Sequence, residues 1–283
     1  ADRVVSRIAT PGSETDELQD DLATTEVAEM SEFSGVLPTG RLEVFGASVS
    51  VANWIGGSGN WSDATHWDIG VVPNNTEAIT YQVVMDVAGD QTITVDQEVT
   101  VGSLTNTELL YVDGVGATVE LETINSGVIA LTGDASQLSL SGSVYVTGQI
   151  LAGTGTFSLA NASATVTGSG ARIAADSAAI LDSVDLHATD GGVLSLLGAA
   201  SFTSGTGGNT LEATGTGSRV DLSGLSDFAG GSSGATQLQA LNGGELALSG
   251  DFHGATLWVL DGSGGVFEAS GVTNLADATV NVS

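Results

Sequence analysis

The sequence predicts an all-β fold, a right-handed parallel β-helix, and three observations favour it. Small residues dominate, with 40 glycines among 283 residues and only 5% aromatic residues, which suits narrow coils. Short stretches in which apolar and polar residues alternate recur along the chain, as expected for strands with one buried side. Glycine-rich turns separate these stretches, and similar segments return at unequal spacings of 19 to 27 residues, within the range of solenoid repeats. The handedness follows from the general chirality of parallel strand connections.

Composition and charge exclude several classes of protein. Five arginines and no lysine stand against 34 acidic residues, so the formal net charge is −29 and a nucleic-acid-binding surface is not expected. The absence of cysteine excludes a disulfide framework and thiolate metal sites. No stretch approaches 18 consecutive apolar residues, so a membrane-spanning helix is not expected either.

Residues 1–45 are predicted to form an acidic N-terminal arm. Between residues 13 and 32 there are eight acidic side chains and no basic one, a run typical of a solvated segment, with a short capping helix as the alternative. Short apolar stretches near both ends of the arm are typical of strands, and such a strand can add to the sheet of a neighbouring molecule. The residues expected to take part in this assembly are Val4, Val5, Val44 and Phe45.

Residues 46–80 are predicted to form a tryptophan-rich cap. Three of the four tryptophans, Trp54, Trp61 and Trp67, lie within fourteen residues of a chain that is otherwise built from small side chains. Large aromatic rings at one end of a solenoid suit a cap over the apolar end of the coils. The alternative is a partner contact, in which exposed indoles stack on sugar rings.

The same segment carries a family resemblance. Residues 54–73 read W-I-G-G-S-G-N-W-S-D-A-T-H-W-D-I-G-V-V-P. This stretch of about twenty residues resembles a motif that precedes β-helical repeats in large secreted bacterial surface proteins, which include adhesins and autotransporter-like passengers. The strand-like residues 92–104 that follow also resemble the first coils of that family. The resemblance implies a parallel β-helix and an extracellular or cell-surface location, and it implies no catalytic residues.

Residues 81–283 are predicted to form the coils of the β-helix. Each repeat combines two alternating strands with a glycine-rich turn, in which Asp-Gly or Asn-Gly-Gly supplies positive φ where the chain changes sheet. A third strand often surrounds an inward-facing phenylalanine. An arrangement of β-sandwich repeats is the alternative fold. The proposed anchors are Leu186, Leu211, Leu238, Leu257 and Val280, and the inward phenylalanines are Phe202, Phe228 and Phe252.

Sequence patterns for catalysis and metal binding are weak. The three histidines, His66, His187 and His253, lack metal-ligand spacing, and a tandem calcium nonapeptide is absent. The acidic pairs Asp182 with Asp185 and Asp221 with Asp227 are the ones considered for an inverting glycosidase, but solvated turn carboxylates explain them better. We therefore expect no enzyme activity, no catalytic residue and no required cofactor. Calcium binding is conceivable without being indicated by a motif.

The last residues read as a strand that begins a new coil. Val280 and Val282 alternate with polar residues, and an uncovered solenoid end presents unpaired strand amides and carbonyls to another chain. We expect a non-catalytic extracellular structural protein that assembles with itself, head to tail, into a bacterial surface filament or matrix. The alternatives are an adhesin that binds a glycan or a cell surface, and a glycan-active β-helix enzyme.

Overall fold

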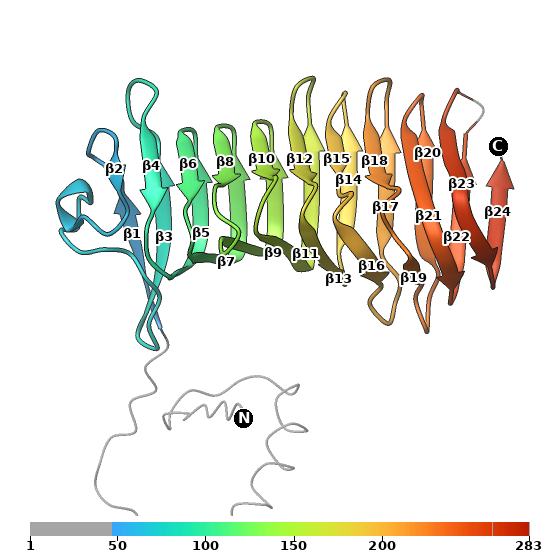
Figure 1. Cartoon of the computed structure of the whole chain (residues 1–283), viewed down its shortest axis with the longest axis horizontal. Helices are drawn as coiled ribbons and strands as arrows, with labels where there is room; N and C mark the ends of the chain where they lie inside the picture. Colours follow the sequence, from blue (N-terminus) through green and yellow to red (C-terminus); the bar gives the residue numbers. More distant parts are fainter. Residues whose placement is uncertain (1–46, 262, 283) are drawn as a thin grey trace, which may run out of the picture. The chain divides into compact units, whose positions relative to one another are not determined.

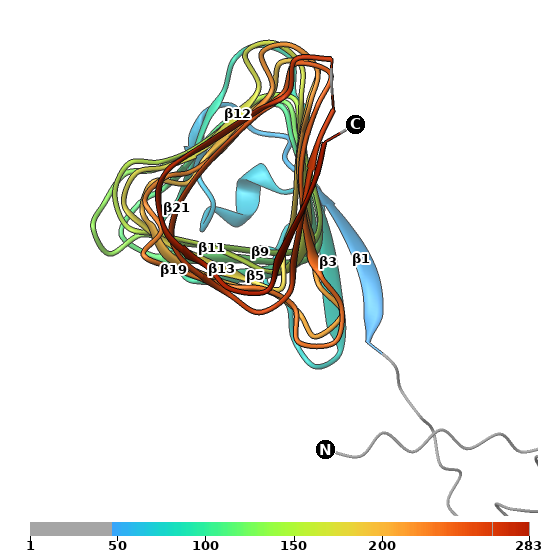
Figure 2. The same cartoon turned by 90° about the vertical axis from the view of Figure 1, so that its right-hand side faces the viewer.

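The computed structural model describes residues 47–261 and 263–282, and these are almost entirely β-structure. Gly46–Ser283 forms one compact unit, in which strands lie side by side in a row of stacked coils (Figure 1). Seen along that row, each coil has a three-sided outline (Figure 2). The parallel β-helix predicted from the sequence is therefore confirmed.

The three sides of the coils are three faces of parallel strands, and the pairings between named strands are all parallel. The longer strands bend around a corner and serve two faces. The first face contains β1 (Ser48–Asn53), β3 (Ile79–Met85), the second halves of β5 (Val99–Asn106), β7 (Gly116–Asn125), β9 (Gln137–Val146) and β11 (Thr156–Thr167), then β14 (Asp185–Thr189), β17 (Thr210–Thr214), β20 (Thr236–Leu241), β22 (Thr256–Leu260) and β24 (Ala278–Val282).

The other two faces are built in the same way. The second contains β2 (Gly59–Asn60), β4 (Thr92–Val95), β6 (Leu109–Val112), β8 (Val128–Leu131), β10 (Gln149–Ala152), β12 (Arg172–Ala175), β15 (Val193–Ser195), β18 (Arg219–Leu222) and the first halves of β21 (Glu245–His253) and β23 (Val266–Leu275). The third contains the first halves of β5, β7, β9 and β11, then β13 (Ala178–Asp182), β16 (Ala199–Thr203), β19 (Asp227–Ala229) and the second halves of β21 and β23.

The core is a set of side-chain columns that run through successive coils. Because residues alternate across a strand, every second side chain points inward and stacks on the equivalent residue of the next coil. Phe202, Phe228 and Phe252 form one such column and are fully buried, with ring centroids 4.6 and 4.4 Å apart. The prediction that these phenylalanines point inward is confirmed.

The leucine column departs from the predicted alignment at its fourth member. Leu186 pairs with Leu211 and Leu211 with Leu238, as predicted, but Leu238 then pairs with Trp258, which pairs with Val280. Leu257, the predicted anchor, lies one residue off and faces outward. Residues 257–260 are a continuous apolar run, so periodicity cannot tell which member faces inward. In the structure the largest of them fills the core, with its ring 5.5 Å from Phe252.

The glycine-rich turns lie at the corner between the first and second faces. Asp190 and Asn242 both have φ of 52°, and the glycines that follow, Gly191 and Gly243, have φ of 87° and 86°. Asp, Asn and Gly are the residues that adopt the left-handed region at low cost, so the predicted role of these turns is confirmed.

In the first coils the same corner is held by buried amides. Asn106 and Asn125 are fully buried, and the Asn106 Nδ2 donates to Asn125 Oδ1 at 2.8 Å. Asn125 Nδ2 donates onward to the Gln149 carbonyl at 2.9 Å. Each amide therefore satisfies backbone groups at a turn and links one coil to the next, as buried polar groups require.

The alternative of β-sandwich repeats is wrong, because a sandwich is built from antiparallel sheets. The predicted acidic arm, residues 1–45, lies outside the described residues. The predicted cap, residues 46–80, and the predicted coils, residues 81–283, belong to one compact unit, and β3 crosses the boundary between them.

Candidate functional site

The three predicted cap tryptophans pack together at the N-terminal end of the coils. Each is 2% exposed. Trp67 lies between the other two, with ring centroids 5.0 Å from Trp54 and 4.8 Å from Trp61, in edge-to-face geometries that aromatic rings prefer. Sugar stacking needs an exposed indole face, and these faces are buried.

The indole N–H groups are all used inside the cap. Trp54 Nε1 donates to the Gly57 carbonyl at 3.0 Å, Trp61 Nε1 to the Pro73 carbonyl at 3.1 Å, and Trp67 Nε1 to the Trp61 carbonyl at 2.9 Å. The three indoles therefore stabilise the loop of residues 54–73 through hydrogen bonds within the loop, and they also cover the core.

The glycines of the same motif make room for His66. A Cβ atom added to Gly56 or to Gly59 would collide with the imidazole ring of His66, which also lies 4.7 Å from the Trp54 ring. His66 is the last residue of the 3₁₀ helix η2 (Ala64–His66). The motif G-G-S-G thus creates the space in which a histidine packs, and this histidine is a structural part of the cap.

Two aspartates stabilise the conformation of the cap loop through local hydrogen bonds. Asp63 caps η2 by accepting hydrogen bonds from the Thr65 hydroxyl and backbone N–H at 2.6 and 2.9 Å. Asp68 accepts from the side-chain amide and backbone N–H of Asn53 at 2.6 and 2.8 Å. These hydrogen bonds favour the ionised form and lower the pKa of both Asp63 and Asp68 below the ordinary value of 3.8.

Asp68 also closes part of the outer edge of β1. Backbone groups of alternate residues in a parallel strand face the same neighbour. The N–H groups of Ser48 and Trp54 donate towards β3, so those of Val49, Val51 and Asn53 face away from it. The Asn53 N–H donates to the Asp68 carboxylate, and the Asn53 carbonyl accepts from the Asp68 N–H. The outward-facing backbone groups of Val49 and Val51 have no hydrogen-bond partner among the described residues.

The opposite end of the first face is the predicted assembly strand, β24. It pairs with β22 on one side only, within the part of the chain that the structure describes. The Thr256 N–H donates to the Asp277 carbonyl, so the backbone groups of Ala278, Val280 and Val282 face away from β22. Val280 and Val282 are 59% and 70% exposed.

The remaining predicted assembly residues, Val4, Val5, Val44 and Phe45, lie outside the described residues. The sequence reasoning missed β1 as an edge strand. A signal was present in the alternation of residues 48–52, S-V-S-V-A, directly before the tryptophan motif.

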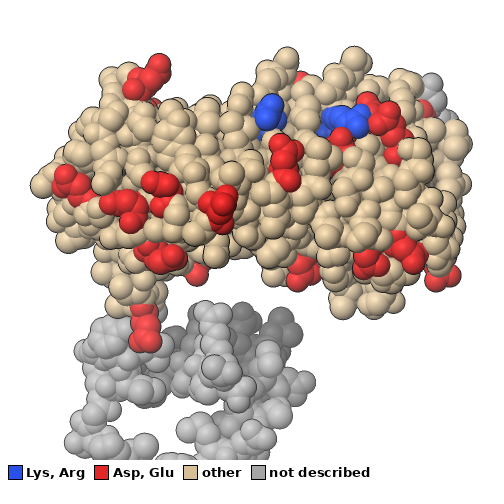
Figure 3. Space-filling view, viewed as in Figure 1, with Lys and Arg blue, Asp and Glu red and all other residues tan. Residues whose placement is uncertain are grey.

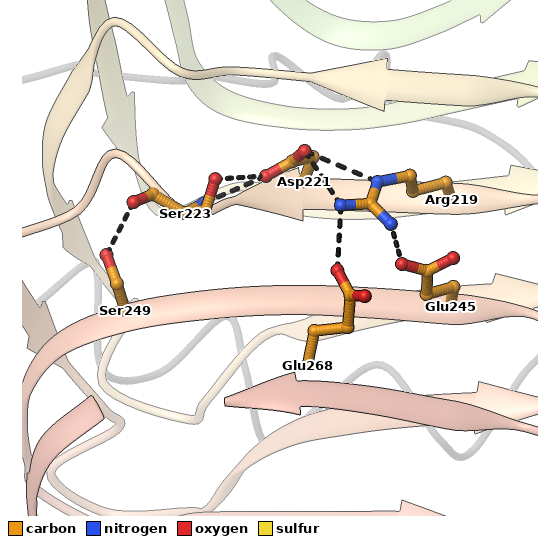
Figure 4. A network of polar contacts seen from close by, with 6 residues as sticks. All are labelled: Arg219, Asp221, Ser223, Glu245, Ser249 and Glu268. Atoms are coloured by element: carbon orange, nitrogen blue, oxygen red, sulfur yellow. Dashed lines mark hydrogen bonds and ion pairs between the residues drawn. The ribbon is translucent and has the colours of Figure 1, made fainter. Parts of the chain in front are cut away.

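Arg219 holds three carboxylates on the second face. Its Nη2 lies 3.0 Å from Asp221 Oδ2 and 3.0 Å from Glu268 Oε2, and its Nη1 contacts Glu245 (Figure 4). These residues lie on β18, β21 and β23, so one guanidinium ties three coils together. Burial opposes ionisation of Asp221, but hydrogen bonds from Ser223 and Arg219 outweigh it and lower the pKa of Asp221.

The carboxylates considered for glycosidase chemistry are occupied with structural contacts. Asp185 accepts from the Thr210 N–H at 2.7 Å and from Asn209 Nδ2 at 3.1 Å. Asp221 belongs to the Arg219 network, and Asp227 lies on a different strand, 3.4 Å from the imidazole of His253. Across residues 47–261 and 263–282, no three His, Asp or Glu side chains gather so that they could hold a metal ion.

A groove on the outside of the second face was not predicted. It has a volume of about 390 Å³ and lies where β12 pairs with β15. Ala174 faces outward and is one of the lining residues, and it is only 8% exposed. The shape of the groove depends on which residues of successive coils lie side by side. The sequence of a single repeat does not show which residues these are. The lining residues are Gly170, Ala171, Arg172, Ala174, Asp176, Val193 and Ser195.

Comparisons with known proteins define no family for this chain: no family model, no curated protein and no solved structure matches it significantly. The fold and site geometry define the class as a parallel β-solenoid with a tryptophan cap at one end. The resemblance to secreted bacterial surface proteins stays a prediction. Within the described ranges, no helix has both the length and the apolar character needed to cross a membrane.

Proposed function

We propose that this chain is a non-catalytic structural protein of the bacterial cell exterior, and that its solenoids assemble end to end into a filament or matrix. The observation that carries the proposal is that β1 and β24 are the two outermost strands of one continuous face and that each has an unpaired edge among the described residues. The exterior location rests on the resemblance of residues 54–73 alone.

The two edges match in direction and in length. Every strand between β1 and β24 on the first face is parallel to its neighbours, so β24 of one molecule would pair with β1 of the next in the same sense. The strands have six and five residues. Such a contact joins two different surfaces and repeats without closing, which produces a linear polymer.

The free backbone groups select the register of this contact. Val280 opposite Ser50 would let the Val280 N–H donate to the Val49 carbonyl and its carbonyl accept from the Val51 N–H. A shift that placed Val280 opposite Ala52 would bring the Val280 carbonyl to the Asn53 N–H, which already donates to Asp68, whereas in this register only the Val282 carbonyl at the end of the contact faces that group. We therefore propose the register in which Asn281 lies beside Val51.

Charge opposes the contact and makes it dependent on ionic conditions. A chain with a net charge of −29 repels its copies, and salt or divalent cations screen that repulsion. We expect single short rods at low salt, and filaments when the salt is raised to about 0.5 M, where the Debye length is well below 10 Å. Electron microscopy with added sodium chloride, and separately with calcium, measures this.

Engineered cysteines test the register directly, because the natural chain has none. Neighbouring strands lie about 4.8 Å apart, within reach of a disulfide. Mixing the Val51→Cys variant with the Asn281→Cys variant in salt should give a disulfide-linked dimer under mild oxidation. The pair Val51→Cys with Thr279→Cys, shifted by two residues, is the matched control. Monodisperse rods in every condition, or equal crosslinking of both pairs, would count against the proposal.

A further inference from the structure

Arg172 differs from Arg219, the other arginine of the described residues. Both are on the second face and appear as the two blue areas of Figure 3. Arg219 is surrounded by three carboxylates, whereas no ion pair or side-chain hydrogen bond involves Arg172 within residues 47–261 and 263–282. In a chain this acidic, an exposed guanidinium without a carboxylate partner is available for an anion from outside.

The groove beside Arg172 is large enough for a small ligand. Its volume of about 390 Å³ falls at the lower end of the range for small-molecule sites. Ala174 lies two residues along β12 from Arg172 and provides an apolar floor, because its small side chain leaves space where Leu151 fills the equivalent position on β10. Val193, paired with Arg172 on the next coil, continues that apolar surface.

Two polar side chains, Asp176 and Ser195, also line the groove. The Asp176 carboxylate can accept a hydrogen bond from a ligand hydroxyl, and the Ser195 hydroxyl can donate or accept. A planar guanidinium recognises a carboxylate through two parallel hydrogen bonds. The groove therefore combines a site for one anionic group, partners for hydroxyls, and an apolar floor for C–H groups.

We infer that this groove binds a small hydroxylated carboxylate of the size of one acidic sugar unit. The net charge of −29 opposes the binding of any anion, and it opposes a polyanion more strongly than a ligand with a single carboxylate. The inference does not rest on end-to-end assembly, since the groove lies on the side of the coils and β1 and β24 lie at their ends (Figure 1).

The test measures binding of galacturonate to the full chain, with calorimetry and with the side-chain N–H signals of ¹⁵N-labelled arginine. We expect a Kd in the millimolar range, consistent with a ligand of this size, and a shift of one arginine signal. Arg172→Gln should weaken binding at least tenfold and remove that signal. Ala174→Leu should block the groove and weaken binding similarly while Arg172 is retained.

Controls separate the inference from simpler explanations. Ala178→Leu makes the same change at an exposed position on the third face and should leave binding unchanged. Galactose, which lacks the carboxylate, should bind at least tenfold more weakly than galacturonate. Unchanged binding in Arg172→Gln would overturn the inference. Equal binding of inorganic phosphate would also overturn it, because the groove would then be a simple anion site.

Discussion

At the scale of single residues, the tryptophan cap shows how one motif solves the problem of a solenoid's end. A coil in the middle of the row is covered on both sides, whereas the first coil of the described residues has a neighbouring coil on one side only. Trp54, Trp61 and Trp67 supply that cover, and their N–H groups bond to carbonyls of the same loop. Gly56 and Gly59 are required because His66 occupies the space that a side chain would need.

Trp61→Ala should destabilise the protein by about 3–5 kcal/mol, the usual effect of removing a large buried aromatic side chain. Trp61 is 2% exposed, and its loss also frees the Pro73 carbonyl and removes the ring against which Trp67 packs. Urea unfolding followed by circular dichroism measures the change. Ile55→Ala, at a neighbouring residue that is 59% exposed, is the control and should cost less than about 0.5 kcal/mol. Equal stability of the two variants would show that the rings do not cap the core.

At the scale of elements, the buried amides of the first coils replace the glycine turns of the later ones. Asn106 and Asn125 end strands β5 and β7, and their side chains satisfy backbone groups at the corner. In the later coils Asp190 and Asn242 turn the same corner with positive φ instead. Two local solutions therefore maintain one coil geometry along the chain.

Asn125→Leu should cost about 1–3 kcal/mol, because it removes the buried hydrogen bonds that Asn125 accepts from the Asn106 amide and donates to the Gln149 carbonyl. Thermal and urea unfolding give the difference in stability. Asn60→Leu, at an exposed asparagine of β2, is the matched control and should have little effect. If both substitutions cost the same, the bonds between Asn106 and Asn125 contribute nothing beyond the shape of the side chain.

The strands and turns illustrate how far sequence patterns reach. Alternation and turn chemistry predict the inward phenylalanines and the positive φ of Asp190 and Asn242, because both depend on neighbouring residues in the sequence. Leu257 was misaligned because its apolar run does not alternate. The groove at Arg172 was missed because it arises from pairing with residues more than twenty positions away, such as Gln149 and Val193. Local sequence patterns thus predict which side of a strand is buried. They do not predict the outer surface, because its shape depends on which residues of successive coils lie side by side.

At the scale of the whole molecule, the coils form a nearly one-dimensional structure. Each coil contacts the coils before and after it, so stability is a sum of terms for coils and for their contacts. The ends differ: the tryptophans cover one, while β23 and β24 have exposed apolar side chains at the other, including Leu275 and Val282. On the face drawn in Figure 3, acidic side chains are spread along the coils rather than gathered at one end. Within the described residues, local opening is therefore expected to begin at the coil of β23 and β24.

Hydrogen exchange of the full chain tests this gradient and its link to assembly. At low salt the amides of β11 and β14 should exchange slowest, and those of β24 fastest among the strands, because β24, like β1, has one paired edge but lacks the contacts that the tryptophan cap makes with β1. Raising the salt to about 0.5 M should protect β24 and the Val51 region of β1 together, and leave β11 unchanged. Such paired protection follows only if one molecule's last strand meets another's first. If high salt protects an outer face of the coils but not β1 and β24, the molecules associate side by side. If β24 and β11 are equally protected at low salt, the outer edge of β24 is not unpaired.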